Sequence, residues 1–202
     1  MNLQQEMAGT QALRFIPPHS TQGHLPCAVG EGDIAPDFTL INAEGRLVNL
    51  SEALTRRPVV LGFYEGRWCH FCNRALKAME KAHFSFNKME TLTIMISPHT
   101  AEYIREFKGE KRLTLNLLSD PGNCVAEAYG LDYAVPKEIR RIYLHMGIDL
   151  KRYNGDASWR LPMPARYIID QDRIIRYARI TPGHIQQPEP TDLLEVLQDL
   201  RI

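Results

Sequence analysis

Long apolar runs alternate with amphipathic segments along this chain, which predicts strands separated by helices. Residues 58–64 (PVVLGFY) are apolar at nearly every position and rich in β-branched or aromatic residues, as a strand buried on both faces is, and residues 91–97 (TLTIMIS) predict another buried strand. Between them, apolar side chains recur at helical spacing from Ala75 to Phe86. We therefore expect a long helix that begins near Cys69 and joins the two strands.

The rest of the chain predicts shorter elements around these strands. Before the first buried strand we expect two short strands joined by a Glu44-Gly45 turn and a short helix capped by Ser51. After the second buried strand we expect a helix over 101–112, a strand over 115–119, a short helix closed by Gly130 and an amphipathic helix opened by Pro136. The chain then continues with a polar loop over 151–164, a hairpin with arms 166–169 and 174–180, and a last helix over 191–200. Because right-handed crossovers place the early strands parallel, the order β-α-β-α-β predicts a central sheet with helices on both faces. Residues 1–29 lack periodicity, so we expect an extended or flexible tail before one α/β domain over residues 30–202.

Charge and composition exclude several classes of function. The 24 Lys and Arg balance the 24 Asp and Glu, so no overall field draws the chain to nucleic acid or to an anionic membrane. No apolar run approaches the roughly 20 residues needed to span a bilayer. The first residues, MNLQQEMAGTQ, lack the basic start and apolar core of a secretory signal. Only 4 cysteines are present, too few for a disulfide scaffold, which favours a reducing, cytoplasmic location.

The strongest candidate for chemistry is the segment GRWCHFC, residues 66–72, which directly follows the first buried strand. This position is the carboxyl end of a central strand and the start of a helix, where sites in open α/β sheets gather. Unpaired backbone N–H groups in the first helical turn favour an anion, so we expect Cys69 to be exposed and to have a lowered pKa. Cys72 lies one turn further in and suits a less exposed partner that closes a disulfide with Cys69.

Four neighbours are candidates to support this pair of cysteines. Arg67 and His70 could add positive charge beside a thiolate. Trp68 would form an apolar wall next to the sulfur, and Glu65 is the nearest carboxylate and a candidate for a base.

Two other interpretations of the pair have less support. A structural zinc site needs four ligands, and neither a second CxxC nor a paired histidine is present, since His83 lies on the wrong part of the helix. A purely structural disulfide across so short a loop would constrain little unfolded-chain entropy. We therefore expect redox chemistry, no metal and no cofactor. Cys27 and a half-buried Cys124 are expected to be inert, and the other histidines, His99 among them, receive no site.

Several segments together resemble the alkyl hydroperoxide reductase/thiol-specific antioxidant (AhpC/TSA) superfamily, specifically its peroxiredoxin-like branch with a CxxC. They are GDIAPDFTL, FYEGRWCHFCNRAL, LLSDPGNCVAEAYGL, GIDLKRYNGDASWRLPMPA and RYIIDQDRIIRYA, and they run from about Gly30 to the C-terminus. The resemblance implies a thioredoxin-like fold and thiol-dependent reduction of hydroperoxides, an antioxidant role. It also implies that Cys69 is the attacking sulfur and Cys72 the resolving one. The implied partners are a hydroperoxide and a thioredoxin-like or other thiol reductant, and the resemblance allows a homodimer.

The chain departs from this family at positions that bear on catalysis. Relatives usually carry Pro-Tyr where this chain has His70-Phe71, and a threonine where it has Arg166. Full peroxiredoxins place Pro and then Thr or Ser where this chain has Gly62 and Gly66, so the hydroxyl that orients the peroxide is absent. The family's arginine is also absent at the Pro164 position. We therefore expect a slow peroxidase, in which Arg166 could supply charge to the peroxide.

The resemblance leaves two alternatives open. One is a thioredoxin-like thiol–disulfide oxidoreductase that acts on protein disulfides, although thioredoxin's buried acid has only Gly62 in its place. The other is a non-catalytic binding domain of the same fold, against which the intact CxxC argues. The resemblance also predicts that Met163–Pro164 is a cis peptide packed beside the cysteines.

Overall fold

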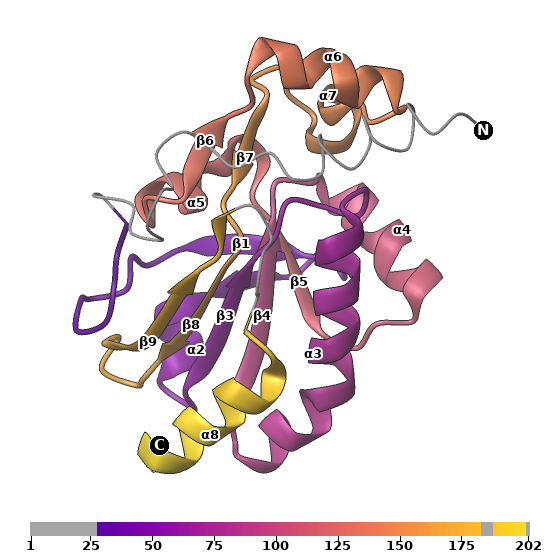
Figure 1. Ribbon diagram of the computed structural model, residues 1–202. Helices are drawn as coiled ribbons and strands as arrows, with labels where there is room; N and C mark the ends of the chain where they lie inside the picture. The colour runs from indigo at the N-terminus through magenta and orange to yellow at the C-terminus, as the bar shows by residue number, and fades with distance from the viewer. Residues whose placement is uncertain (1–27, 183–187, 201–202) are drawn as a thin grey trace.

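Strand β3 (Val59–Phe63), which precedes the two cysteines, lies near the middle of a seven-stranded sheet (Figure 1). The computed structural model describes residues 28–182 and 188–200. In that part of the chain the strand order is β2-β1-β5-β4-β3-β8-β9, with β3, β4 and β5 parallel and the outer strands antiparallel to their neighbours. The other strands are β1 (Thr39–Asn42), β2 (Leu47–Asn49), β4 (Leu92–Ser97), β5 (Asn116–Ser119), β8 (Ala165–Ile169) and β9 (Ile175–Ile180). The predicted mixed central sheet is confirmed.

Helices cover both faces of the sheet because its central strands bury side chains on both sides. Along β3, Val60 belongs to one buried cluster, whereas Leu61 and Phe63 belong to the cluster on the opposite face. Helices α3 (His70–Lys88), α4 (Ala101–Lys111) and α8 (Pro190–Leu200) pack on the Val60 face. Helices α2 (Leu50–Leu54) and α5 (Cys124–Ala128), the latter preceded by the 3₁₀ turn η1 (Pro121–Asn123), pack on the other face.

A second, two-stranded sheet lies above the central one, beyond the carboxyl end of β3 (Figure 1). It consists of β6 (Asp132–Ala134) and β7 (Arg160–Pro162), and helices α6 (Lys137–His145) and α7 (Leu150–Asn154) accompany it around a small core of their own. The polar loop expected over 151–164 is therefore wrong, because part of it forms α7 and β7. Three-residue strands and a five-residue helix are too short to show a hydrophobic period.

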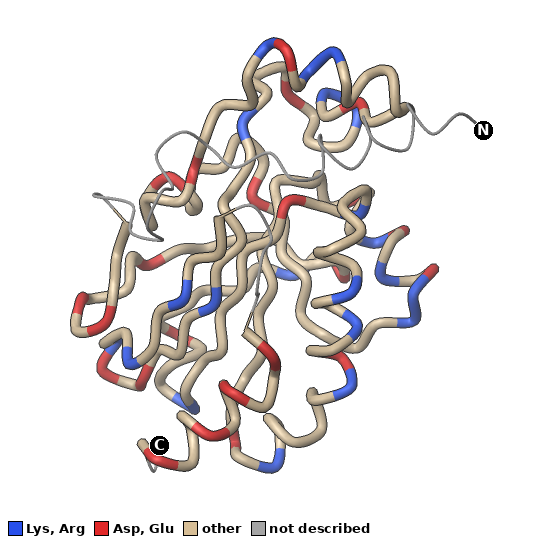
Figure 2. Tube along the Cα trace, viewed as in Figure 1, with Lys and Arg blue, Asp and Glu red and all other residues tan. Residues whose placement is uncertain are grey.

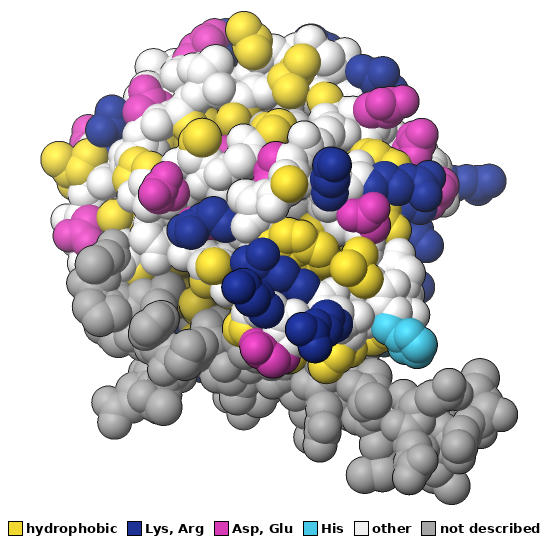
Figure 3. Space-filling view, turned by 90° about the horizontal axis from the view of Figure 1, so that it is seen from above, with side chains coloured by type: hydrophobic (Ala, Val, Ile, Leu, Met, Phe, Trp, Pro, Cys, Tyr) yellow, Lys and Arg dark blue, Asp and Glu magenta, His cyan; other side chains and the backbone are white. Residues whose placement is uncertain are grey.

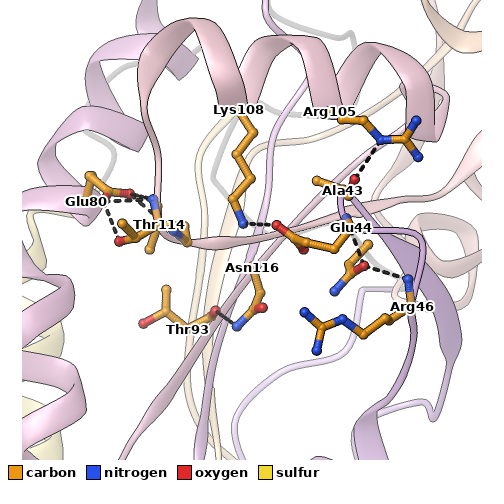
Figure 4. Close-up of polar contacts among 11 residues, drawn as sticks. Ala43, Glu44, Arg46, Glu80, Thr93, Arg105, Lys108, Thr114 and Asn116 are labelled. Atoms are coloured by element: carbon orange, nitrogen blue, oxygen red, sulfur yellow. Dashed lines mark hydrogen bonds and ion pairs between the residues drawn. The ribbon is translucent and has the colours of Figure 1, made fainter.

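Polar contacts fasten α3 and α4 to the sheet (Figure 4). Glu80 of α3 accepts hydrogen bonds from the backbone N–H of Thr114 at 2.9 Å, just before β5. Lys108 of α4 pairs with Glu44 at 2.6 Å, in the turn between β1 and β2. These contacts hold both helices against the sheet on the face that carries the cysteines.

Two local expectations are corrected by the structure. The side chain of Asn49 caps α2 by accepting from the backbone N–H of Glu52, so the cap lies two residues before the expected Ser51. Asn and Ser are about equally good at this position, and the sequence alone does not choose between them. Cys124 is exposed rather than half-buried. Cys27 lies outside the described residues.

Residues of both charge signs are interspersed along the described part of the chain (Figure 2). None of the helices in the described ranges is both long and apolar enough to cross a bilayer.

Candidate active site at the start of helix α3

The two cysteines lie where β3 has ended and α3 begins, as the sequence predicts. Cys69 is the N-cap residue of α3, and its Sγ accepts a hydrogen bond from the backbone N–H of Cys72 at 3.3 Å. The side-chain amide of Asn73 donates to the carbonyl of Arg67 at 2.7 Å and fixes the segment that leads into the helix. The start of the helix thus holds the two cysteines together as a CxxC pair.

The structure contradicts the expected exposure and acidity of Cys69. Both Cys69 and Cys72 are 1% exposed. A hydrogen bond with Cys72, burial, and the nearby charges of Cys72 and Glu65 raise the pKa of the Cys69 thiol, and the backbone hydrogen bond from Cys72 offsets only part of this. The lowered pKa was predicted from the position of Cys69 at the helix start. That prediction did not include the burial of the thiol or the Glu65 carboxyl group beside it.

Glu65 forms a compact group with the two cysteines. One ligand-type atom from each of Glu65, Cys69 and Cys72 lies within 4.8 Å of the others, and all three residues are buried. The hydroxyl of Tyr133, from β6, donates to Oε1 of Glu65 at 2.7 Å and orients the carboxyl group. Burial and Glu65 raise the pKa of Tyr133, so its hydroxyl stays a donor. The small upper sheet thus positions a carboxyl group next to the thiols.

His99 holds the backbone of the loop before the cysteines. It follows β4, is 1% exposed, and its Nε2 accepts the backbone N–H of Arg67 at 3.0 Å. Its Nδ1–H donates to Oδ1 of Asn154 at 2.9 Å, and its ring stacks on Tyr153 at 5.4 Å. Burial lowers the pKa of His99 to about 4, so the ring is neutral and can accept the Arg67 N–H.

Gly66 is the residue that allows His99 to approach. Its φ of +145° is rarely adopted by residues with a side chain, and a Cβ there would lie 2.3 Å from Cε1 of His99. A threonine or serine, which full peroxiredoxins carry at this position, therefore does not fit beside His99.

We predict that Gly66→Ala destabilises the protein by about 2–5 kcal/mol, because it adds backbone strain to a steric clash. Gly109→Ala is the matched control: Gly109 lies inside α4, nothing is within 4 Å of its added Cβ, and the change should stabilise by about 0.5–1 kcal/mol. Urea unfolding of both variants measures the difference. Equal stabilities would contradict the close packing of Gly66 on His99.

Arg67 and His70 do not supply charge to the sulfur in this arrangement. The guanidinium of Arg67 pairs with Glu110 at 3.0 Å and Glu106 at 3.7 Å, both on α4. His70 is exposed at the first position of α3, with its ring edge-on to Phe71. Their positions near the cysteines in sequence gave no information on side-chain direction.

Arg166 is a buried cation behind the cysteine pair. It is 2% exposed, and its Nη1 donates to the carbonyls of Phe63 at 3.2 Å and Ala165 at 2.8 Å. Burial lowers its pKa to about 10, while the nearby Cys72 acts in the opposite direction. A Cβ on Gly62 would lie 2.6 Å from Met95 and 3.0 Å from Nη1 of Arg166, so the site of thioredoxin's acid is filled by these side chains.

Pro164 differs from its expected geometry, whereas Trp68 packs against the cluster that holds the cysteines, as expected, and also makes a further contact. No cis peptide bond occurs among the described residues, so the predicted cis Met163–Pro164 bond is wrong. Pro164 is buried, and its carbonyl accepts from the backbone N–H of Thr181 at 2.8 Å. Trp68 packs on Tyr143 of α6 at 5.1 Å, and its buried indole N–H has no hydrogen-bond partner among the described residues. The ring is thus more than an apolar wall.

The family follows from a direct comparison of sequences. Residues 31–178 match the family described as the AhpC/TSA family. The chain belongs to this family. The predicted superfamily is confirmed, and the match covers most of the domain expected over residues 30–202.

Similar AhpC/TSA proteins are peroxiredoxins. The chain is 33% identical to a peroxiredoxin Q of Triticum aestivum over 85% of this chain and 68% of the relative. It is 29% identical to a peroxiredoxin Q of Oryza sativa subsp. japonica over 95% of this chain and 77% of the relative. Among solved structures, the peroxidoxin BcpB of Mycobacterium tuberculosis superposes with a TM-score of 0.68 at 21% identity, covering 86% of this chain and 99% of that one, which supports the thioredoxin-like fold.

These relatives establish the type of activity. The chain is a thiol-dependent peroxidase of the peroxiredoxin type, whose chemistry uses cysteines without a cofactor. Peroxiredoxins act on hydroperoxides and are reduced by thioredoxin-like proteins. The expected cytoplasmic location is contradicted, because the plant relatives are named as chloroplastic proteins.

Sequence reasoning missed two residues of this AhpC/TSA site, His99 and Tyr133. His99 comes two residues after β4, and the ends of parallel strands meet at one edge of the sheet, so its place after a predicted strand was a usable signal. Tyr133 lies on a strand that the sequence does not predict, and nothing in the pattern indicates it.

Proposed function

We propose that Cys69 is the sulfur that attacks the hydroperoxide, that Cys72 resolves the product, and that Glu65 is the proton acceptor for the pair. The observation that carries this proposal is the buried group of Glu65, Cys69 and Cys72 within 4.8 Å at the start of α3. A thiol with a raised pKa is a poor nucleophile until a base takes its proton. The carboxyl group that Tyr133 orients is the nearest such base.

The reaction proceeds in two steps. Glu65 takes the proton of Cys69 as the sulfur attacks one peroxide oxygen; the S–O bond forms, the O–O bond breaks, and the proton passes to the departing alkoxide to give an alcohol. The Cys72 sulfur then attacks the sulfenic acid at Cys69, the S–S bond forms, and hydroxide leaves as water with the Cys72 proton. Each turnover reduces one hydroperoxide and oxidises two thiols to a disulfide.

Trp68 is the proposed donor to the peroxide in place of the missing hydroxyl. The Cβ of a residue at position 66 would lie 3.0 Å from its Nε1, so the indole N–H occupies the region where relatives carry a hydroxyl. The burial of this N–H favours a hydrogen bond to an entering oxygen. One donor of this kind contributes about 2.7–4 kcal/mol to a transition state.

Glu65→Gln tests the proton acceptor. We expect the rate of Cys69 oxidation by hydrogen peroxide to fall roughly 10²–10⁴-fold at pH 7, because the thiol loses its base. The variant's rate should then rise with pH, as hydroxide replaces the carboxylate. Stopped-flow tryptophan fluorescence from pH 6 to pH 9 measures both effects.

The control for this test is Glu195→Gln on the exposed side of α8, which should leave the rate unchanged. An unchanged or faster rate in Glu65→Gln would contradict the proposal. It would show that Glu65 only raises the pKa of Cys69 and does not accept its proton.

The thiol reductant is proposed to approach over α6. Lys and Arg side chains gather with hydrophobic ones on the face that Figure 3 shows, where exposed residues of α6 and α7 include Lys137, Arg141, Lys151 and Arg152. Tyr143 connects α6 to Trp68 beside the cysteines. A reductant with an acidic surface would be steered here, and its rate of reaction with the oxidised protein would fall as the salt concentration rises.

A homodimer stays a prediction, which analytical ultracentrifugation would test.

A further inference from the structure

We propose that the reduced site also binds one thiophilic divalent cation, of which zinc is the representative, through Cys69, Cys72 and Glu65. The sequence argued against metal because only two ligands were visible. The fold adds a third, since the loop after β3 brings the Glu65 carboxyl group to the two thiols. Two thiolates and one carboxylate form a ligand set that zinc accepts.

The distances fit a metal site after a small adjustment. One ligand atom from each residue lies within 4.8 Å of the other two. Zinc binds sulfur at about 2.3 Å and carboxylate oxygen at about 2.0–2.2 Å, so ligand atoms around one ion lie roughly 3.5–4 Å apart. Side-chain rotations of Glu65 and Cys72 that move their ligand atoms by up to about 1 Å would bring the three atoms to these separations.

The surroundings favour a bound cation. All three ligands are buried, so a cation would offset the cost of holding anionic sulfur and oxygen away from water. Tyr133 donates to Oε1 of Glu65 at 2.7 Å and thereby orients the ligating carboxyl group, as outer hydrogen bonds commonly do at metal sites. With three protein ligands the fourth position stays open, which distinguishes this site from a closed structural zinc site.

Binding would be linked to the redox state. Coordination releases the two thiol protons and engages the lone pairs that attack peroxide, so the metal protects the pair from oxidation. A hydroperoxide that does oxidise the bound pair takes up two protons and gives the disulfide, the free cation, an alcohol and water. The oxidised site has no thiolate left among its three ligands, keeps only the Glu65 carboxylate, and releases the ion. Zinc is thus an inhibitor that the reduced form captures and the oxidised form does not.

Zinc titration of the reduced chain tests the site without any peroxide, so its outcome is independent of the proposed catalytic roles. A Cys27→Ser/Cys124→Ser background removes the other two thiols, and zinc alone is titrated against a chromogenic chelator. We expect one zinc per reduced chain and none per disulfide-oxidised chain. Cobalt alone should give a thiolate-to-metal absorption band that Cys69→Ser and Cys72→Ser each weaken.

Glu65→Gln should lower the zinc affinity by roughly tenfold or more, and Tyr133→Phe by a similar factor through the lost orientation, whereas Glu195→Gln should leave it unchanged. Near-ultraviolet circular dichroism checks that each variant is folded. If Glu65→Gln does not fold, Tyr133→Phe tests the part of Glu65 in zinc binding instead. Equal affinity in the wild type and Glu65→Gln, binding by the oxidised chain, or no binding at all would each overturn the proposal.

Discussion

Cys69→Ser should abolish catalysed peroxide consumption, down to the rate measured without the protein. The substitution removes the sulfur at the N-cap of α3, which is the one proposed to attack the peroxide. A serine hydroxyl in the same place has a far higher pKa than a thiol and does not attack peroxide oxygen. Steady-state assays with a thiol reductant and hydrogen peroxide measure the loss.

Cys72→Ser gives the complementary result. One equivalent of peroxide should still oxidise Cys69, and the product should stay a sulfenic acid, because the proposed partner that forms the disulfide is absent. Mass spectrometry after dimedone labelling detects it. Cys124→Ser, at an exposed position, is the control and should retain full turnover. If Cys72→Ser lost the first oxidation while Cys69→Ser kept it, the assigned roles would be reversed.

Acid should weaken folding by about 3 kcal/mol between pH 6.5 and pH 4 through His99 alone. The pKa of His99 is about 4 in the folded protein, against about 6.5 for an ordinary histidine in the unfolded chain. In this window the unfolded chain binds a proton that the folded protein does not, so stability rises with pH. The stabilisation is complete above about pH 6.5 and falls steadily as the pH drops to about 4.

Urea unfolding of the wild type and His99→Gln across this range measures the contribution. The variant should lose the pH-dependent difference, because glutamine does not titrate. His145→Gln, at an exposed position of α6, should follow the wild-type curve. Parallel curves for the wild type and His99→Gln would show that His99 is not held neutral in the folded protein.

The central part of the fold could be predicted because its signals are local and strong. The apolar runs over residues 58–64 and 91–97 predict β3 and β4, and the helical spacing from Ala75 to Phe86 predicts α3. The upper sheet of β6 and β7 could not be predicted, because strands of three residues carry almost no pattern.

The candidate site, like the fold, could be predicted only in part. The place of Cys69 and Cys72 follows from a strand that precedes them and a helix that begins with them. Their burial does not, because it depends on side chains of other elements that share their cluster, such as Val60 of β3 and Ile168 of β8. Glu65 was visible only as a neighbour in sequence, and its part in the site depends on the position of Tyr133 in the upper sheet.

Gly66 illustrates how one long-range contact changes an interpretation. The sequence presents it as a catalytic hydroxyl that is missing. The structure shows that His99 fills the space, so Gly66→Thr would disrupt the loop instead of restoring the hydroxyl. Glycine in place of the Thr or Ser of full peroxiredoxins at position 66 therefore goes together with His99, whose ring occupies the space that their side chain would need.

Stopped-flow oxidation of the reduced wild type by hydrogen peroxide, an organic hydroperoxide and a model disulfide tests the central claim most directly. If Glu65 acts as the base of a peroxidase, peroxide oxidises Cys69 faster than it oxidises free cysteine, and a Cys69–Cys72 disulfide is the product. The rate constant should lie below those of peroxiredoxins that carry the hydroxyl. Oxidation by peroxide no faster than that of free cysteine, together with a rapid reaction with the disulfide, would contradict the peroxidase account and favour a thiol–disulfide oxidoreductase.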